Sequence, residues 1–422
     1  VFYGLPGDLE HGRRQLRHWK AELEQLTADL SQWKMAVPHE HPFSHQPLSP
    51  REFLAEHSAR TAFAEQLQTL WRSRMPENPR QRGDSLVARV TFIGELPTLT
   101  TDFSHIREVS LTGHDALRNV DGFLQPFNTL RHLELHDFNL GQNPLTSMRM
   151  TSLQRLVLEH CGLTLTPQSR ASLSSLENLR YLNLSRNPLG AHPPLEALPA
   201  LVQLRMIDTG ISSLPDGLLG HPRLLIAMLE RNRIRDLPDI LFDISARPPK
   251  QLSLADNPLS STTRERIKLC YQQFRQHFGV SMPREDLERI RELFPSLSDD
   301  DANRVLYLLP GTLDFGRLQI GRWETELRQL EGDLEKWVTD VPDRYPASSI
   351  ELTASDRSAE QASRRMFRQE IESFWRERSR EHPERRSTVL NLNPAFIGDL
   401  PDLSADFSHV TTLSITGNAQ LR

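Results

Sequence analysis

The sequence has little of what membrane-spanning chains, disulfide-rich secreted domains and most enzymes depend on. Only 2 of its 422 residues are cysteine, which is too few for a disulfide framework, and neither lies in a Cys-x-x-Cys pair of the kind that binds structural zinc. No apolar run approaches the roughly 18 residues that would cross a bilayer. Glycine-rich nucleotide loops, the Gly-x-Ser-x-Gly elbow and the His-Glu-x-x-His motif are also missing. We therefore expect no catalytic residue, no cofactor and no membrane segment in these residues.

The positive charge is carried almost entirely by arginine. Of the 50 basic residues only five are lysines, namely Lys20, Lys34, Lys250, Lys268 and Lys336. Two explanations stay open: the codon usage of a GC-rich genome, or a lack of acceptor amines in a protein that works beside lysine-modifying enzymes. The formal net charge of −5 is small for this length, and both signs are mixed along the chain. This balance argues against a nucleic-acid partner.

The chain repeats its own beginning. Residues 1–118 align without a gap with residues 305–422, so that Trp33 matches Trp337 and Trp71 matches Trp375. The motif Asp-Phe-Ser-His of the first copy also returns in the second. Because the first residue is Val1 and the second copy stops early, we expect both ends to be cuts and the chain to be a window onto a longer tandem array.

A shorter repeat lies between the two copies. The template Leu-x-x-Leu-x-Leu-x-x-Asn/Cys-x-Leu, in full or looser form, starts near positions 106, 130, 153, 179, 201, 224 and 249, and this pattern is typical of leucine-rich repeats. Its Leu-x-Leu step places two side chains on one face of a short strand, while the Asn or Cys turns inward to bind the backbone of the next loop. Cys161 stands at the Asn/Cys position, so we interpret it as a packing residue rather than a nucleophile.

Helices are expected on both sides of these repeats. Apolar residues in steps of three and four define one helix face over residues 16–33 and a second helix over 63–71, and the pattern returns over 320–337 and 367–375. We favour packing within each hairpin over oligomerisation, because the apolar face is only one hairpin long. The hairpin would then cap the open edge of the first repeat.

Together these patterns predict the architecture of the chain. The expected fold class is α/β: a leucine-rich-repeat solenoid whose parallel sheet forms an arc, flanked by α-helical hairpin caps, with the unit duplicated at an offset of 304 residues. The expected domains are a helical hairpin cap at 1–84, the solenoid at 85–260, a C-terminal helical cap and linker at 261–310, a second hairpin cap at 311–388 and the start of a second array at 389–422.

The template also predicts which side chains face outward from the concave side of the sheet. One expected row is Glu108, His132, Arg155, Tyr181, Gln203, Ile226 and Gln251, and the next is Ser110, Glu134, Val157, Asn183, Arg205, Met228 and Ser253. Aromatic, arginine and methionine side chains on a rigid surface are typical of protein-binding hot spots. The predicted partner-binding residues are His132, Glu134, His136, Arg155, Glu159, His160, Tyr181, Arg186, Arg205, Asp208, Met228 and Arg231.

Histidines and carboxylates of this face are close together in the sequence. His132, Glu134 and His136 would point the same way, and together with Asp137, Glu159 and His160 they have residue types that suit a metal site. Nothing on an open sheet would shield a metal or hold its ligands in place from behind. We therefore interpret these side chains as polar contact residues and expect no metal.

Several motifs resemble a known family. They are the Asp-Phe-Ser-His lead-in, the Leu-Pro-Asp-Gly-Leu-Leu and Leu-Pro-Asp-Ile-Leu-Phe steps, and the Leu-x-Leu-x-x-Asn-Pro-Leu units at Leu182 and Leu252. They are similar to the leucine-rich-repeat region of bacterial (pseudomonad) effector proteins of the novel E3 ligase (NEL) ubiquitin ligase family. The resemblance implies that the repeats select a host protein as substrate and that the parent protein is a virulence factor secreted into the host cell cytoplasm.

The resemblance also implies that the catalysis lies elsewhere. In that family a cysteine of a Cys-x-Asp motif, in a separate helical domain, receives ubiquitin from a loaded E2 enzyme. Here Cys161 is followed by Gly162-Leu163, and Cys270 by Tyr271-Gln272. Neither matches, so the resemblance assigns no catalytic residue to this chain, and the E2 partner would bind only the missing domain.

Two functions from different classes stay open. The first is the substrate-recognition region of a secreted effector E3 ubiquitin ligase, and the alternative is a non-enzymatic leucine-rich-repeat scaffold or adhesin that holds partners at a fixed distance. A Cys-x-Asp motif in a helical domain beyond these residues would favour the first, and a membrane anchor or more repeats the second. The second array could bind a different partner or shield the catalytic domain. Catalysis within the chain would rest on the histidine and carboxylate cluster alone.

Overall fold

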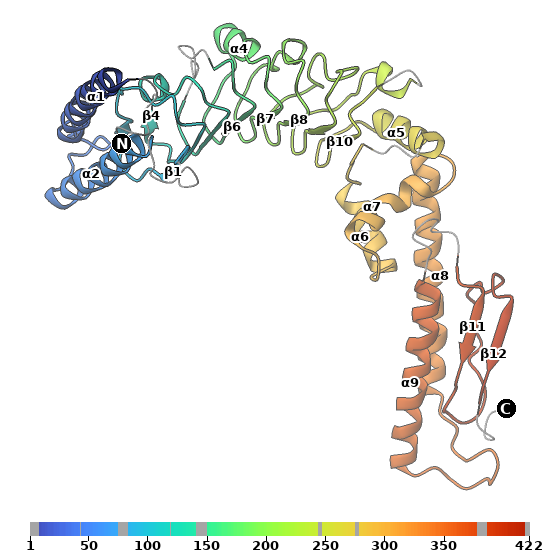
Figure 1. Ribbon diagram of the computed structural model, residues 1–422. Helices are drawn as coiled ribbons and strands as arrows, with labels where there is room; N and C mark the ends of the chain where they lie inside the picture. The colour runs from blue at the N-terminus through green and yellow to red at the C-terminus, as the bar shows by residue number, and fades with distance from the viewer. Residues whose placement is uncertain are drawn as a thin grey trace. The chain divides into compact units, whose positions relative to one another are not determined.

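The computed structural model divides the chain into two compact units (Figure 1). Unit 1 comprises Val1–Ser260 and Phe278–Val280, and unit 2 comprises Ser261–His277 and Ser281–Arg422. The structure describes residues 8–42, 44–74, 83–118, 120–140, 150–243, 247–274, 278–377 and 386–417. No helix within these ranges is both long enough and apolar enough to cross a membrane.

Unit 1 is built around a parallel sheet of eight strands whose order follows the chain. The strands lie side by side in a single stack (Figure 1). They are β1 (Ser85–Arg89), β3 (Glu108–Thr112), β5 (His132–His136), β6 (Arg155–Glu159), β7 (Tyr181–Asn183), β8 (Gln203–Arg205), β9 (Ile226–Met228) and β10 (Gln251–Ser253). Each strand from β3 onward begins two residues after the expected start of its repeat, so the predicted period is confirmed. Strand β1 precedes the first expected repeat and was not predicted.

The core of unit 1 is a stack of equivalent leucines behind this sheet. Leu133, Leu156, Leu182 and Leu204 stand at the same place in successive repeats and are all fully buried. Each leucine packs against the repeats before and after it, so no repeat can bury its own apolar side chains alone. The return segments are short. They contain the two-stranded sheet of β2 (Gly94–Glu95) and β4 (Leu117–Arg118), then α3 (Asp121–Leu124), α4 (Pro167–Ser174), η3 (Leu195–Ala197) and η4 (Asp239–Phe242).

Buried asparagines tie one repeat to the next. The side-chain oxygen of Asn187 accepts hydrogen bonds from the backbone amides of Cys161 (2.8 Å) and Leu163 (3.0 Å) in the preceding repeat. Its Nδ2 donates to the carbonyl of Leu158 at 2.6 Å and to that of Leu184 at 2.9 Å. Asn232 and Asn257 bind the preceding repeats in the same way. The inward turn that the template predicts is therefore confirmed.

Cys161 occupies the same template position with a smaller side chain. Its thiol is fully buried and donates to the carbonyl of Leu135 at 3.3 Å. Burial raises the pKa of this thiol to about 12. Because the nucleophilic form of cysteine is the thiolate, Cys161 is a protonated packing residue at neutral pH.

A helical hairpin lies at the β1 end of the sheet (Figure 1). It consists of α1 (Leu9–Met35) and α2 (Pro50–Arg72), and α2 begins with a capping box between Ser49 and Glu52. The side chain of Arg60 is 2% exposed and donates to the carbonyls of Trp33 (2.7 Å), Ala36 (3.1 Å) and Ile93 (3.0 Å). One buried arginine thus fastens the end of α1 to α2 and to the segment after β1.

Unit 2 contains a hairpin of the same dimensions, preceded by three shorter helices. The short helices are α5 (Ser261–Phe274), α6 (Arg284–Leu293) and α7 (Asp299–Leu308). The hairpin is α8 (Leu313–Thr339) and α9 (Ala354–Arg376), with 27 and 23 residues, as in α1 and α2. It is followed by the parallel pair β11 (Val389–Leu392) and β12 (Thr412–Ile415). Residues 418–422 of the expected second array lie outside the described residues.

Candidate protein-binding site

The sheet of unit 1 aligns the predicted contact residues in two adjacent rows. The pairing of the strands sets Glu108, His132, Arg155, Tyr181, Gln203, Ile226 and Gln251 opposite one another. The second row is Ser110, Glu134, Val157, Asn183, Arg205, Met228 and Ser253. The predicted register therefore agrees with the structure. The role of these residues in binding stays a prediction.

Two members of the second row are covered. Val157 is 2% exposed and Asn183 is 5% exposed. The amide of Asn183 donates to Glu159 Oε2 at 3.1 Å and accepts from the backbone amide of Ser185 at 3.0 Å. The expectation that both face a partner is wrong, because the asparagine is engaged within the sheet and the valine side chain is buried.

The polar residues of β3, β5 and β6 are already paired with one another. His132 Nδ1 lies 2.8 Å from Glu108 Oε1, and Arg155 Nε lies 2.6 Å from Glu134 Oε1. The Arg155 guanidinium also stacks over the ring of Tyr181, 3.8 Å from its centroid. These contacts hold long side chains in fixed positions, which lowers the entropy that they would lose on binding a partner.

The histidines of this region do not converge on a common point. His136 lies 3.9 Å from the carboxylates of both Glu134 and Glu159, whereas His160 Nδ1 lies 2.7 Å from Asp137 Oδ1. Across the described ranges, no group of three or more His, Cys, Asp or Glu side chains is arranged to hold a metal ion. Each histidine instead lies beside one or two carboxylates of neighbouring residues.

A third line of polar residues follows the carboxyl ends of the strands. They share the same place in successive repeats and have φ between 54° and 61°; they are Asp137, His160, Arg186, Asp208, Arg231 and Asp256. The backbone amide of each of the central ones binds the next repeat, as Arg186 does to the carbonyl of Ile207 at 2.8 Å. The left-handed turn directs the following residue inward, and the strand spacing of about 4.8 Å separates the exposed side chains.

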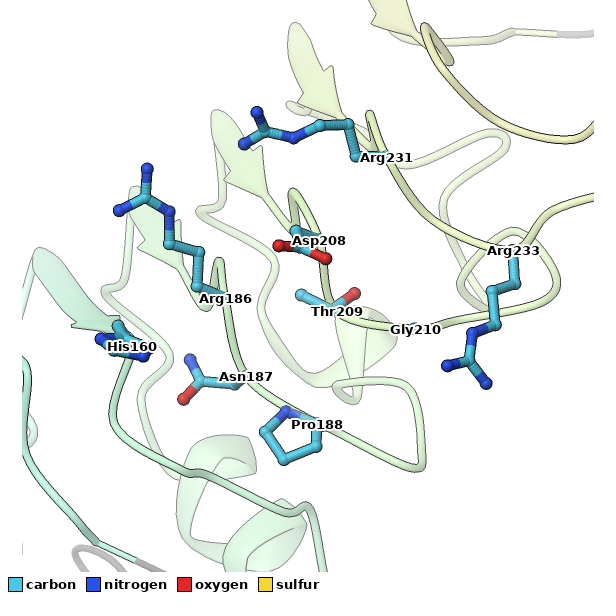
Figure 2. Close-up of a pocket in the computed structure, with 9 residues that line it drawn as sticks. All are labelled: His160, Arg186, Asn187, Pro188, Asp208, Thr209, Gly210, Arg231 and Arg233. Carbon is cyan, nitrogen blue, oxygen red and sulfur yellow. The ribbon is translucent and has the colours of Figure 1, made fainter. Parts of the chain in front are cut away.

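An open pocket of about 420 Å³ lies along this line (Figure 2). Its lining residues are His160, Arg186, Asn187, Pro188, Asp208, Thr209, Gly210, Arg231 and Arg233. Figure 2 shows Arg186 and Arg231 on either side of Asp208, with Arg233 farther along the same edge. The lining therefore includes three arginines and one aspartate, so its formal charge is positive. The Arg186 guanidinium is itself paired with a carboxylate outside the lining, with Nη1 3.8 Å from Glu159 Oε1.

Arg233 was not predicted as a site residue, although the sequence contains a signal for it. It is separated from Arg231 by Asn232, which is 6% exposed and turned inward. Arg231 stands before this asparagine in the left-handed turn and Arg233 directly after it, and both are exposed. The template alone would therefore have placed both arginines at the same edge.

Two buried polar atoms of the site lack a hydrogen-bond partner in the described part of the chain. They are Nε of Arg205, on β8, and Oε2 of Glu230, just after β9. Buried polar atoms in folded proteins are nearly always satisfied by protein, water or ligand. Because both atoms are buried, they are not contact points for a partner. The half-buried apolar side chains of Ile226 and Met228 are the accessible groups of β9.

Comparison with known protein families identifies one segment of this sheet. Residues 178–199 match the Leucine Rich Repeat family. This segment contains β7 and η3, and it shows that unit 1 includes a leucine-rich-repeat region. A search of curated proteins finds no match to the chain.

Proposed function

We propose that unit 1 is a protein-recognition module whose leucine-rich repeats bind a partner over β5 to β9 and the adjoining pocket. The observation that carries this proposal is the register, which brings Tyr181, Arg205 and Met228 onto one face of a rigid sheet. Aromatic, arginine and methionine side chains are enriched at the energetic centres of protein interfaces.

The residues that line the pocket predict which chemical groups the partner carries. Arg186, Arg231 and Arg233 line one open volume together with the carboxylate of Asp208. Guanidinium groups bind carboxylates and phosphates through paired hydrogen bonds. The partner surface is therefore expected to bring an acidic or phosphorylated side chain to this edge.

The test compares affinity capture from eukaryotic host lysate by three forms of the full chain. The wild type and the triple variant Tyr181→Ala, Arg205→Ala, Met228→Ala differ on the sheet face. A matched control carries Glu177→Ala, Arg223→Ala and Ile240→Ala, all exposed on the return segments. A protein retained by the wild type and the control should bind the sheet-face variant at least about a hundredfold more weakly. Equal retention by all three forms would contradict the proposal.

The arginine preference has its own test once a partner is captured. Arg231→Ala with Arg233→Ala should weaken binding about tenfold and make it less sensitive to salt, because screened charge pairs are lost. Unchanged salt dependence would remove the pocket from the binding site while leaving the sheet face in place.

The parent protein is proposed to be a bacterial effector ubiquitin ligase of the novel E3 ligase family. The motifs quoted from the repeats and the scarcity of lysine support this assignment. The full-length protein should form a reductant-sensitive ubiquitin adduct when it is mixed with a loaded E2 enzyme. Partner binding without such an adduct would favour the scaffold or adhesin.

The scaffold alternative is favoured by the second hairpin and the strands that follow it. We propose that these elements are a copy of the first hairpin, displaced by 304 residues, and the start of a second array. Strand β11 pairs with β12 from Val389↔Thr412 onward, and β1 pairs with β3 from Ser85↔Glu108 onward. The isolated bridges Glu40↔Pro47 and Arg344↔Glu351 have the same displacement. A tandem array of this kind could hold two partners.

A further inference from the structure

The first helix of each hairpin carries the same apolar face, but other helices bury this face in unit 2 more completely than in unit 1. In unit 2, Ile320, Trp323 and Leu327 of α8 are 0%, 3% and 7% exposed, because α6 and α7 pack against this helix. The equivalent residues of α1, which are Leu16, Trp19 and Leu23, are half-exposed. Unit 1 therefore leaves open an apolar face that unit 2 uses for helix packing.

The cover in unit 2 is centred on Phe294, directly after α6. Its ring centroid lies 5.5 Å from that of Trp323 and 6.4 Å from that of Trp375. At the end of α9, Arg376 donates to the carbonyls of Glu292 (2.6 Å) and Leu293 (3.1 Å), where α6 ends. These bonds satisfy carbonyls that a helix end leaves free.

Within the described residues of unit 1, no helix pair like α6 and α7 covers the corresponding groups of α1 and α2. Trp19, Trp71 and Arg72 stand where unit 2 has Trp323, Trp375 and Arg376. Arg72 is exposed, and the indole nitrogen of Trp71 is buried without a hydrogen-bond partner among the described residues. Trp71 is 5% exposed, and the Arg74 guanidinium stacks over its ring at 4.2 Å from the centroid. The open face therefore presents Trp19 and the helix-end donor Arg72.

Charge distinguishes the two faces. In unit 2, α6 is held to α8 by two ion pairs: Arg317 Nη2 lies 3.0 Å from Asp286 Oδ2, and Arg289 Nε lies 2.6 Å from Glu324 Oε1. Arg13 stands at the place of Arg317 in α1, but Lys20 stands at the place of Glu324. The first contact would keep its sign, whereas the second would favour a carboxylate opposite the lysine. The present ion pair of Lys20 with Glu24, at 3.8 Å, is exposed to solvent and contributes little.

We propose that this face of α1 docks a helical pair from another module of the same tandem array, shaped like α6 and α7 but with an acidic residue in place of Arg289. The inference rests on the proposed duplication. A second copy of this chain fits poorly, since its α6 already covers its own α8 and would set Arg289 against Lys20. The docked pair would bury Leu16, Trp19 and Leu23 and give Arg72 the carbonyls of a helix end.

The experiment joins a second copy of residues 281–312 directly ahead of Leu9 in the full chain. One graft keeps Arg289 and the other carries Arg289→Glu. Hydrogen exchange of α1, followed by mass spectrometry, measures how strongly the docked helices protect the backbone amides of this helix. The Arg289→Glu graft should slow exchange of α1 at least about tenfold, since docking removes opening motions of the covered helix. Its effect should exceed that of the unchanged graft by about threefold, the size of one partly exposed ion pair.

A charge exchange provides the control. With Lys20→Glu in α1, the order of the two grafts should reverse, while exchange in β5 to β9 stays constant. The proposal is overturned if α1 is unprotected in both grafts, if the two grafts protect equally, or if the chain alone dimerises and protects α1 as its concentration rises. None of these readouts depends on partner binding at the leucine-rich face, so the result is independent of the recognition proposal.

Discussion

The two hairpins are fastened by equivalent buried arginines, but their hydrogen-bond networks differ in completeness. Arg60 and Arg364 each donate to three carbonyls. Arg364 Nε also donates to Glu360 Oε1 at 2.9 Å, whereas Arg60 Nε has no partner in the described residues. Burial lowers the pKa of the Arg60 guanidinium, and the nearby Glu56 carboxylate partly offsets that effect. The same scaffold residue therefore joins the same segments in both hairpins, and its surroundings decide how well its charge is satisfied.

Replacing these arginines by alanine should give the largest difference in lost stability between the two hairpins. Arg364→Ala removes four hydrogen-bonded contacts and leaves Glu360, which is 7% exposed, as an unpaired buried charge. We expect a loss of about 4 kcal/mol in the stability of unit 2. Arg60→Ala leaves Glu56, which is half-exposed, so its cost in unit 1 should be about 2 kcal/mol. Hydrogen exchange of α8 and α1 measures both losses, and equal losses would show that the carboxylate contact adds nothing.

Replacing the tryptophan on the apolar face of α8 or of α1 should give the second-largest difference in stability between the hairpins. Trp323 is 3% exposed, so Trp323→Ala removes a fully packed ring and should cost about 3 kcal/mol. Trp19 is half-buried, and Trp19→Ala should cost about 1 kcal/mol because part of its area already faces water. The free energy of unfolding of each unit, from urea titration with exchange as the readout, gives the two values. A cost at Trp19 as large as that at Trp323 would mean that its surface is covered.

The sequence predicts those parts of this fold that repeat at short range. The leucine template gives the strand starts and the opposition of Tyr181 to Gln203, because both follow from the alternation of residues along a strand. It cannot predict the buried Arg60, whose carbonyl acceptors come from Trp33, Ala36 and Ile93 in separate segments. Arginine is usually exposed, so burial becomes evident only when those segments are seen together. The open face of α1 was hidden for the same reason, since the pattern of α1 matches that of the covered α8.

The helices that cover α8 contain a buried lysine that should make unit 2 sensitive to pH. Lys268 of α5 is 0% exposed, and its Nζ donates to the carbonyl of Thr312 at 3.0 Å. Burial lowers its pKa from 10.5 to about 8. The unfolded chain therefore holds more protons between these pH values, and the contribution of this group to stability rises as pH increases through that window.

The substitution Lys268→Met isolates this effect from the other titrating groups. The variant should be more stable than the wild type by about 1 to 2 kcal/mol below pH 8, where burial of the charge is costly. The difference should shrink as the pH rises toward 10.5. Unfolding of both proteins is compared at pH 7, 9 and 10.5. A difference that stays constant with pH would show that the lysine is not desolvated.

The two tryptophans at the ends of α2 and α9 give the smallest predicted difference. Trp375 Nε1 donates to Glu326 Oε1 at 2.8 Å, while the equivalent nitrogen of Trp71 is buried without a partner in the described residues. Replacement by Phe removes a similar volume at both sites, so the difference between the two costs reports the hydrogen bond. Trp375→Phe should cost about 1 kcal/mol more than Trp71→Phe. If the two costs are equal, the Trp71 nitrogen must bind something outside the described residues, such as a water molecule, and the first hairpin is then as well satisfied as the second.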